Sequence, residues 1–428
     1  MVLTGGGAVV GRVGAPVRVG SGVDGRPGPV LGRYATAAVL VRLADEGARV
    51  ALVLLAIERT GSAAYGGLLV AALMVPHVVA GPVVGAVADA VRRRRLFYTL
   101  ALLGYGVALV AAVSVAAASR PLSVALVVAA GCLAPIMLGG LTSLLRDLVP
   151  DRLDRAFGLD ATSYNLAGIA GPGIAAVAAG AAGATVATVV LAGLVALGAV
   201  VLWTLPIADR PAPAHHDAAS GPRNPLSAVP LLWRRPRLGA VTLASSFGQL
   251  GVGALPVVAA LLAGRFQHTS YTGLFLAVAS VGGLVGSMWC ARYPIRSHPP
   301  ERVVLACLLA TAVPFALVPL MPSVWATLPL FALVGVLNGP LFCAVLAVRE
   351  QEAPAAAHTQ VFTVGAGLKS TAAAAGAALA GALTGSGVGL LLLGMAACQA
   401  VGAAAGAAVL RLPRRHAAGA GRPAPPVG

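Results

Sequence analysis

Charged side chains are scarce in this sequence. Asp, Glu, Lys and Arg together make up 10% of the 428 residues, whereas 58% of the residues are hydrophobic. A soluble domain of ordinary composition carries about 25% charged residues. The composition therefore excludes a soluble globular protein and indicates an all-α polytopic membrane protein.

Acidic residues are scarcer than basic ones, at 14 against 30, and the net charge is +16. Such a charge can mark a nucleic-acid-binding protein, but the basic residues stand at the ends of apolar runs, with no interleaved aromatic residues. Most fall in segments that we predict to be cytoplasmic. The exceptions are three residues outside (Arg59, Arg120, Arg265) and three within helices (Arg42, Arg49, Lys369). This asymmetry follows the positive-inside rule, so we expect the lipid bilayer of the plasma membrane, and no nucleic acid, as a partner.

Cysteines are few and isolated. All five lie in apolar runs without CxxC or Cys/His spacing, which excludes a disulfide framework or a metal site. The segment Gly367–Thr371 has a lysine but lacks the Gly-Lys step of a phosphate-binding loop. We expect no cofactor, no metal, no ATP hydrolysis and no enzymatic activity.

Long apolar runs dominate the rest of the sequence, each near the ~20 residues that a bilayer crossing requires. Twelve are predicted as helices: Tyr34–Ile57, Tyr65–Ala88, Leu96–Ala118, Leu122–Leu145, Leu159–Ala181, Thr185–Leu205, Leu238–Gly264, Tyr271–Ala291, Val303–Met321, Val324–Val348, Gln360–Ala382 and Val388–Leu410. We expect the loops Glu58–Ala64 outside and Arg146–Arg155 inside. The predicted organisation is a disordered cytoplasmic tail (1–33), a six-helix half (34–206), a proline-rich cytoplasmic linker (207–236), a second six-helix half (237–412) and a cytoplasmic tail (413–428).

The two halves repeat one another. Three pairs of landmarks recur at nearly constant spacing: Gly85 with Gly286, Arg146-Asp147 with Arg349-Glu350, and Phe157 with Phe362. Such self-similarity indicates a duplicated six-helix unit.

The most informative stretch joins the second and third apolar runs. It reads Gly85-x-x-x-Asp89-x-x-x-Arg93-Arg94, a carboxylate followed by clustered arginines in a very short loop. This pattern resembles the signature loop between helices 2 and 3 of the major facilitator superfamily of secondary transporters, although Ala90 and Arg92 depart from the usual pattern. Within that family the chain resembles actinobacterial drug-efflux-type members.

The resemblance implies a fold of twelve transmembrane helices in two parallel six-helix repeats, with both termini cytoplasmic. It also implies a conformational latch formed by Gly85, Asp89, Arg93, Arg94 and Arg146. In similar transporters the aspartate meets the second half near the start of helix 11 and steadies the outward-facing state.

The first predicted helix carries Arg42, Asp45, Glu46 and Arg49 on one stripe. Asp45 falls about 16 Å along the axis from Tyr34, near the middle of an apolar core about 30 Å thick. Charges at this depth must pair or face water. One interpretation is a cavity in which Asp45 or Glu46 binds and releases a proton, and the other is a set of intrahelical ion pairs, Arg42–Glu46 and Asp45–Arg49.

Other polar residues within the apolar runs are candidates with two interpretations each. Lys369 could face an anionic substrate or snorkel toward the cytoplasm, and His77 could relay protons or be structural. Three amides, Asn165, Gln249 and Asn338, could line a substrate cavity or join helices. Gly171-Pro172 resembles the Gly-Pro motif of antiporter members of the family, or is an ordinary kink.

The sequence as a whole predicts a monomeric secondary active transporter that moves a small, amphipathic molecule by alternating access. Proton-coupled efflux is the favoured direction. Proton-coupled uptake of a metabolite and a non-transporting scaffold or sensor with the same fold are the alternatives.

Overall fold

The computed structural model describes residues 28–209, 230, 234–268, 271–295 and 297–411. Most of the predicted N-terminal tail, most of the predicted linker and the C-terminal tail lie outside these residues. Across the described part the chain forms helices and turns, with no strand.

The first half of the chain contains nine helical segments: α1 (Pro29–Thr60), α2 (Ala63–Met74), α3 (Pro76–Ala90), α4 (Arg94–Val115), α5 (Arg120–Pro135), α6 (Leu141–Ser143), α7 (Leu145–Leu148), α8 (Leu153–Ala182) and α9 (Ala184–Trp203). A π-helical turn, η1 (Ile136–Gly140), joins α5 to α6, and a 3₁₀ turn, η2 (Pro150–Arg152), precedes α8.

The second half contains α11 (Pro236–Gly253), α12 (Leu255–Arg265), α13 (Tyr271–Arg292), α14 (Pro300–Leu317), α15 (Val324–Glu352), α16 (His358–Ala382) and α17 (Val388–Arg411). Three 3₁₀ turns, η4 (Val318–Leu320), η5 (Ala355–Ala357) and η6 (Thr384–Ser386), lie between them.

Twelve bilayer crossings follow from these segments. Ten stretches of the described chain are long and apolar enough to cross a membrane, with α2–α3, α5–α7 and α11–α12 each acting as one broken span. The remaining two are α1 and α16, which have 32 and 25 residues. The predicted all-α fold of twelve helices is confirmed.

Prolines explain two of the broken spans. Pro76 opens α3, and Pro256 is the second residue of α12. Because proline has no backbone N–H and clashes with the preceding turn, it interrupts the helix just before it. The predicted helices Tyr65–Ala88 and Leu238–Gly264 are therefore each two segments rather than one.

Several predicted boundaries differ from the structure. α1 begins at Pro29, within the segment predicted as a tail, because proline is suited to the first position of a helix. The predicted loop Arg146–Arg155 is largely helical, as α7, η2 and the start of α8. The predicted loop Glu58–Ala64 shrinks to Gly61 and Ser62, where Gly61 takes the left-handed conformation (φ 64°) that ends α1.

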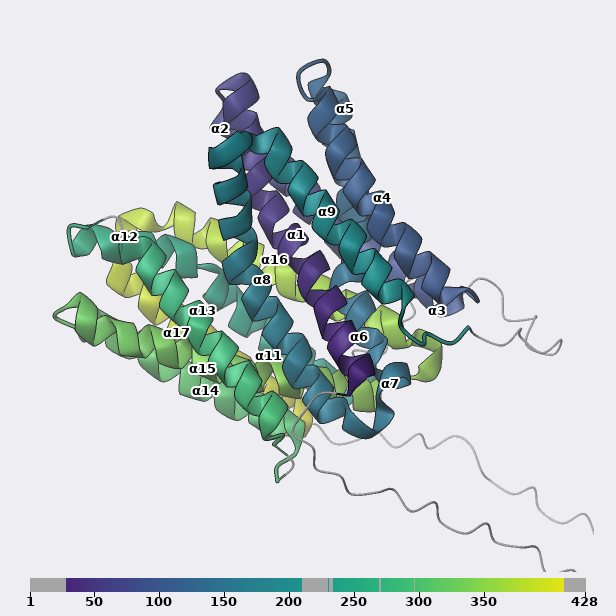
Figure 1. Ribbon diagram of the computed structural model, residues 1–428. Helices are drawn as coiled ribbons and strands as arrows, with labels where there is room; N and C mark the ends of the chain where they lie inside the picture. The colour runs from purple at the N-terminus through teal and green to yellow at the C-terminus, as the bar shows by residue number, and fades with distance from the viewer. Residues whose placement is uncertain (1–27, 210–229, 231–233, 269–270, 296, 412–428) are drawn as a thin grey trace, which may run out of the picture.

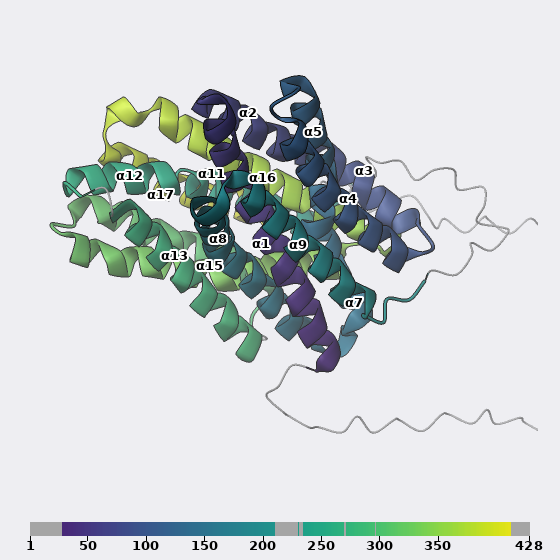
Figure 2. The same cartoon turned by 45° about the horizontal axis from the view of Figure 1, so that its top comes forward.

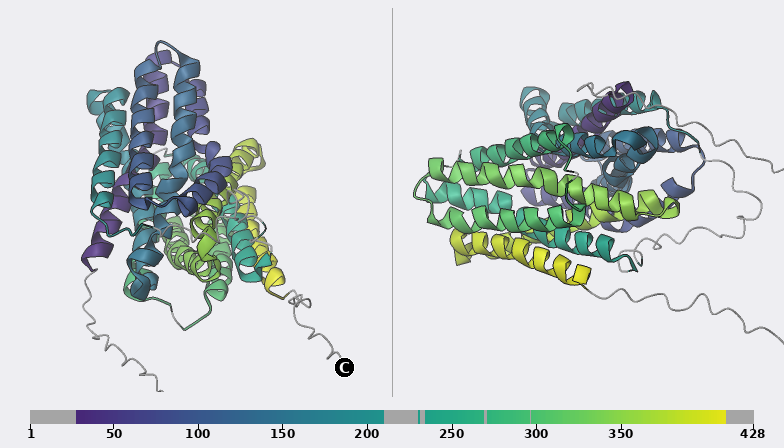
Figure 3. Two further views of the ribbon diagram at one scale, coloured as in Figure 1. Left: turned by 90° about the vertical axis from the view of Figure 1, so that its right-hand side faces the viewer. Right: turned by 90° about the horizontal axis from the view of Figure 1, so that it is seen from below.

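The two halves meet at one end of the molecule and diverge at the other. We call the end that carries Arg92–Arg95 the arginine end, and the other the opposite end. Figure 1 shows α2 and α5 of the first half pointing away from α12 and α14 of the second half at the opposite end. Figure 2 shows the same divergence from a tilted view. In Figure 3 the second half, coloured green to yellow, lies beside the lower part of the first half.

Glycines allow the close contact between the halves. α3 of the first half packs on α16, and α8 packs on α13. A Cβ added at Gly85 would lie 2.6 Å from the Cα of Gln360, and one added at Gly158 would lie 2.4 Å from the Cα of Ala291. These distances leave no room for a side chain, so small residues at these crossings set how tightly the arginine end closes.

We predict that Gly158→Leu opens the arginine end, because overpacking costs about 1–3 kcal/mol, which shifts a two-state equilibrium about 5- to 150-fold. The measurement is the distance distribution between spin labels at Ala118 and Ser386, one on each half at the opposite end. The distance should shorten in Gly158→Leu. Gly168→Leu is the control in the same helix, because a Cβ added there meets no described atom within 4 Å apart from its own helix backbone. Distances that match in both variants and the parent would contradict the proposed role of this crossing.

Candidate functional site

The four charged residues of α1 divide into two groups. Arg42 is 1% exposed and forms an ion pair with Asp160 of α8, at 2.7 Å between Nη1 and Oδ1. The predicted Arg42–Glu46 pair is therefore wrong. On an isolated helix Glu46 is the nearest partner, but the folded protein brings a carboxylate of another helix closer.

Backbone and hydroxyl groups complete the surroundings of Arg42. The guanidinium donates to the Met137 carbonyl oxygen at 3.2 Å, within the π-helical turn η1. It also donates to the Thr142 hydroxyl at 3.1 Å and lies 3.6 Å from the centre of the Tyr164 ring. A π-helical turn alters the regular helical hydrogen bonding, and here one of its carbonyls accepts from a neighbouring helix. The group joins α1, η1, α6 and α8.

Asp160 was not among the predicted site residues. It is fully buried and accepts hydrogen bonds from the Tyr34 hydroxyl at 2.6 Å and the Thr142 hydroxyl at 2.8 Å. The sequence analysis placed it at the second position of the predicted helix Leu159–Ala181. Since α8 begins earlier, at Leu153, Asp160 lies two turns inside the helix. With all these partners Arg42 and Asp160 form a neutral structural pair.

The second group is centred on Arg49. Its guanidinium donates to Glu46 at 2.7 Å and to Asp45 at 3.1 Å, so the predicted Asp45–Arg49 pair is present. Asp45 also accepts from the Tyr105 hydroxyl at 3.1 Å and is 1% exposed, whereas the Glu46 side chain is 28% exposed. Asp45 is fixed by two partners, and Glu46 is the accessible carboxylate.

Glu46 and Arg49 line a cavity of about 170 Å³ between the two halves, which we call the charged cavity. Lys369 of α16 lines it from the second half, with Nζ 4.0 Å from the centre of the Phe342 ring. Lys369 therefore lies inside the protein beside an aromatic face. The structure places three of the charged candidates, Glu46, Arg49 and Lys369, around one space.

Arg349 of α15 lines the same cavity and was missed by the sequence analysis. It was assigned to the cytoplasmic end of its helix, yet it is 3% exposed. Its guanidinium lies on Gly365 of α16, where an added Cβ would be 2.3 Å from Cζ. The sequence feature that could have singled out Arg349 is the internal repeat, in which Arg349 is the second-half counterpart of Arg146.

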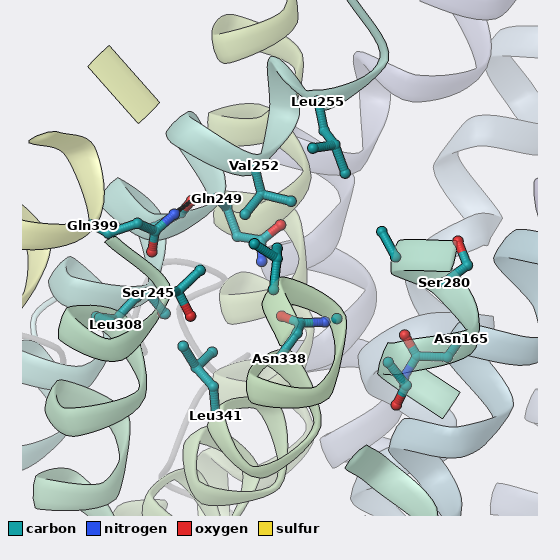
Figure 4. Close-up of a pocket in the computed structure, with 16 residues that line it drawn as sticks. Asn165, Ser245, Gln249, Val252, Leu255, Ser280, Leu308, Asn338, Leu341 and Gln399 are labelled. Atoms are coloured by element: carbon teal, nitrogen blue, oxygen red, sulfur yellow. Dashed lines mark hydrogen bonds between the residues drawn. The ribbon is translucent and has the colours of Figure 1, made fainter. Parts of the chain in front are cut away.

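A second cavity of about 160 Å³ adjoins the first, with Gln249 in the lining of both. Amides predominate among its polar groups, so we call it the amide cavity. Asn165, Gln249 and Asn338, the three predicted amides, all line it (Figure 4). Gln399 also lines it and donates to the Gly248 carbonyl oxygen at 2.9 Å.

The three predicted amides differ in their contacts. Asn165 donates to the Ala161 carbonyl oxygen at 3.0 Å and to the Gly283 carbonyl oxygen at 3.2 Å, so it joins α8 to α13 across the halves. The side chains of Gln249 and Asn338 form no hydrogen bond within the described part of the chain. They are the amides available to another molecule.

The remaining candidates, His77 and Gly171-Pro172, line neither cavity. His77 of α3 is 2% exposed, and neither ring nitrogen has a hydrogen-bond partner among the described residues. The charges of Asp45 and Arg49 act on it. Pro172 lies inside α8 without breaking it, and a Cβ added at Gly171 would lie 2.6 Å from the Leu43 carbonyl oxygen. The Gly-Pro segment is thus the point where α8 crosses α1.

Asp89 links the two halves at the arginine end. It is 1% exposed, and its carboxylate accepts the backbone N–H groups of Thr359 and Gln360, each at 3.0 Å. These are the second and third residues of α16. A helix N-terminus has free N–H groups and a positive dipole, which both favour a carboxylate. We call this contact the latch.

A second link at the arginine end uses side chains alone. Arg146 of α7 pairs with Glu350 of α15 at 3.3 Å, and Glu350 also contacts His358 at 2.8 Å. Of the other residues predicted to act with Asp89, Arg94 forms an ion pair with Asp147 within the first half, and Arg93 is exposed at the start of α4. Only part of the predicted latch set therefore reaches the second half.

Comparison with known proteins identifies the family. Residues 34–377 match the Major Facilitator Superfamily, which is most of the chain. The chain belongs to the Major Facilitator Superfamily. It is therefore an integral membrane transporter of a small molecule and not an enzyme.

Individual relatives within the Major Facilitator Superfamily are distant. The uncharacterized MFS-type transporter y4rN of Sinorhizobium fredii is 26% identical over 368 residues, which cover 82% of this chain and 88% of that protein. A bacterial homologue of the iron transporter ferroportin, solved in an outward-facing state, matches with a TM-score of 0.71 at 14% identity, over 89% of this chain and 99% of that one. The human organic anion transporter MFSD10 (TETRAN) matches with a TM-score of 0.65 at 18% identity, over the same shares. These two structures support the fold.

We predict that Asp89→Asn impairs turnover while leaving equilibrium substrate affinity largely intact. The latch residues line neither cavity, and hydrogen bonds to a charged group contribute about 1.5–3 kcal/mol. The measurement pairs transport rate with equilibrium binding. Asp147→Asn is the control, since its ion pair stays within the first half. A large loss of binding with unchanged opening and closing would contradict the role of Asp89.

Proposed function

We propose that this chain is a proton-coupled secondary active transporter that moves a small, amphipathic molecule by alternating access. We further propose that it exports this molecule across the plasma membrane as a monomer of the drug-efflux type, with both termini and the arginine end cytoplasmic. The observation that carries the proposal is Glu46, an accessible carboxylate that lines the charged cavity and shares Arg49 with Asp45.

The contacts of the two carboxylates support Glu46 as the proton-binding group. Asp45 is held by Arg49 and by the Tyr105 hydroxyl, away from the cavity. Glu46 has Arg49 as its ion-pair partner and borders open space. A proton on Glu46 would release one of the two bonds of Arg49, so protonation would change the charge that a substrate meets. His77, with its unpartnered ring near Asp45 and Arg49, is the proposed relay.

The arrangement of the halves supports alternating access. They are closed together at the arginine end by the latch and by Arg146–Glu350, and they diverge at the opposite end (Figure 1). With the arginine end cytoplasmic, this is an outward-facing state. Opening the latch would expose the cavities to the cytoplasm.

The cavity lining supports an amphipathic substrate. Rings of Tyr164, Phe342 and Phe362 border the charged cavity beside Glu46 and Lys369. Few and well-placed polar groups in a mainly apolar lining are typical of small-molecule sites.

Efflux is supported by the resemblance of Gly171-Pro172 to the antiporter motif. Uptake is the second candidate, and the charge of the cavity favours it. Protonation of Glu46 would make the cavity more positive, so a proton and an anionic substrate would favour each other's binding, by reciprocal linkage. This mutual stabilisation favours a transporter in which the proton and the substrate cross the membrane in the same direction.

We predict that Glu46→Gln abolishes gradient-driven accumulation while sparing substrate exchange at equilibrium, because the variant keeps size and loses titration. A substrate screen in everted membrane vesicles with an imposed proton gradient measures this, with a protonophore as the check on coupling. Uptake into the everted vesicles indicates efflux in the cell.

The matched control is Asp45→Asn, which should affect coupling less because Asp45 does not line the cavity. If both variants still concentrate substrate under a proton gradient, the coupling assignment is wrong and the group is a structural ion-pair cluster. A wild-type protein with no protonophore-sensitive flux of any screened compound would support the scaffold alternative.

A further inference from the structure

We infer that the charged cavity binds an organic anion, with the anionic group held between Lys369 and Arg349. The inference rests on the proposed transport function but not on its direction. It concerns the chemical class of the substrate, which the fold alone leaves open.

The charges around the cavity do not balance. Its charged lining consists of Glu46, Arg49, Arg349 and Lys369, one carboxylate against three cations. Arg49 already serves both Glu46 and Asp45. Within the described residues, neither Arg349 nor Lys369 forms an ion pair or a hydrogen bond to a side chain. Two cations therefore face a cavity without an acidic partner of their own among the described residues.

The nearby acids are committed elsewhere. Glu46 acts electrostatically on Lys369 but is bonded to Arg49 at 2.7 Å. Glu350, the neighbour of Arg349 in the sequence, contacts Arg146 and His358. Because buried charge is costly without a counter-charge, an anion that entered the cavity would be bound strongly.

The two cations approach the cavity at the same stretch of α16. The Arg349 guanidinium lies against Gly365, and Lys369 follows four residues later on α16. Residues four apart lie on the same helix face, about 5–6 Å from one another. Both side chains line the same cavity. A carboxylate, sulfonate or phosphonate offers oxygens to more than one cation, and arginine favours these planar or branched oxyanions.

The remaining lining fits an apolar body attached to that group. The volume of about 170 Å³ is near that of a ~150 Å³ cavity able to hold benzene. The rings of Phe342 and Phe362 and the side chain of Met74 supply apolar surface. The adjoining amide cavity, reached past Gln249, gives room for a longer molecule with hydrogen-bonding groups. Benzoate is thus the smallest probe with the right features.

We predict that the purified full-length chain binds benzoate, benzenesulfonate or phenylphosphonate, and binds benzylamine and benzyl alcohol at least tenfold more weakly. Titration calorimetry in detergent measures this, with the shift in unfolding temperature as a second readout. The ring is constant in this set, so only the charge of the attached group is tested.

Variants assign the site. Lys369→Met should weaken benzoate binding at least tenfold, and Lys369→Arg should restore most of it because it keeps the charge. Gly365→Ala should also weaken binding, since its Cβ would displace the Arg349 guanidinium. Gly381→Ala is the control on α16, because no described atom lies within 4 Å of a Cβ there. Unfolding temperatures of all four variants without ligand show whether each is folded.

The possible failures are distinguishable. Three results would each overturn the inference. The first is tighter binding of benzylamine than of benzoate, and the second is no binding of any of the three anions at millimolar concentration. The third is unchanged benzoate binding in Lys369→Met. Proton-driven, Glu46-dependent transport of a cationic compound would overturn it while leaving the proposed function intact. Benzoate binding through Lys369 without proton-driven movement of any of the three anions would support the site and overturn the proposed function.

Discussion

The constraint on which this structure depends is that charge inside a membrane must find a partner. The middle of α1 carries two arginines and two acids, and each is accommodated differently. Arg42 is neutralised by Asp160 and held by the backbone of a π-helical turn, which fixes α1 against η1, α6 and α8. Removing one partner of such a buried pair costs about 3–5 kcal/mol. Four helical segments of the first half meet at this pair.

The second charged group of α1, around Arg49, borders a cavity, whereas the Arg42 group is buried. Arg49 divides its bonds between Asp45, which is buried, and Glu46, which borders a cavity. Across that cavity stand Arg349 and Lys369 from the second half. One half therefore contributes an accessible carboxylate, and the other contributes cations with no acidic partner among the described residues. In the proposed transport cycle, movement of the halves would change the distance between these groups and so couple the proton to the substrate.

The latch at the arginine end is also a buried charge that has found its partners. Asp89 lies at the end of α3, and its partners are free N–H groups at the start of α16. The glycines at Gly81 and Gly85 let α3 approach close enough for this contact. The contact between the halves thus depends on the Asp89 carboxylate, the start of α16 and the glycines of α3. None of these residues lines a cavity.

Much of the fold could be predicted from the sequence, because apolar runs of membrane length and arginines between them are local features. The kinks at Pro76 and Pro256 were readable in principle from the same residues. The ion-pair partners of the charged residues could not be predicted from the sequence. Spacing on α1 indicates that Arg42 and Glu46 share a face, but not that Asp160 of a distant helix lies closer to Arg42. Arg349 stands near the end of an apolar run, and only the packing of α15 on α16 turns it inward. The three amides were singled out from depth alone, with a substrate cavity and hydrogen bonds between helices as the two interpretations. In the structure Asn165 joins two helices, whereas the other two amides have no hydrogen-bond partner among the described residues. This difference depends on where Gly283 lies, which the sequence does not show.

The central claim is that the proton-binding group and the substrate-binding cations act on each other within one cavity. The most direct test is the number of protons exchanged when benzoate binds to the purified protein, measured with a pH indicator in weakly buffered solution. The claim predicts a change in bound protons for the parent protein and none for Glu46→Gln at the same occupancy. Benzoate binding without proton exchange in the parent, or with equal exchange in Glu46→Gln, would contradict it.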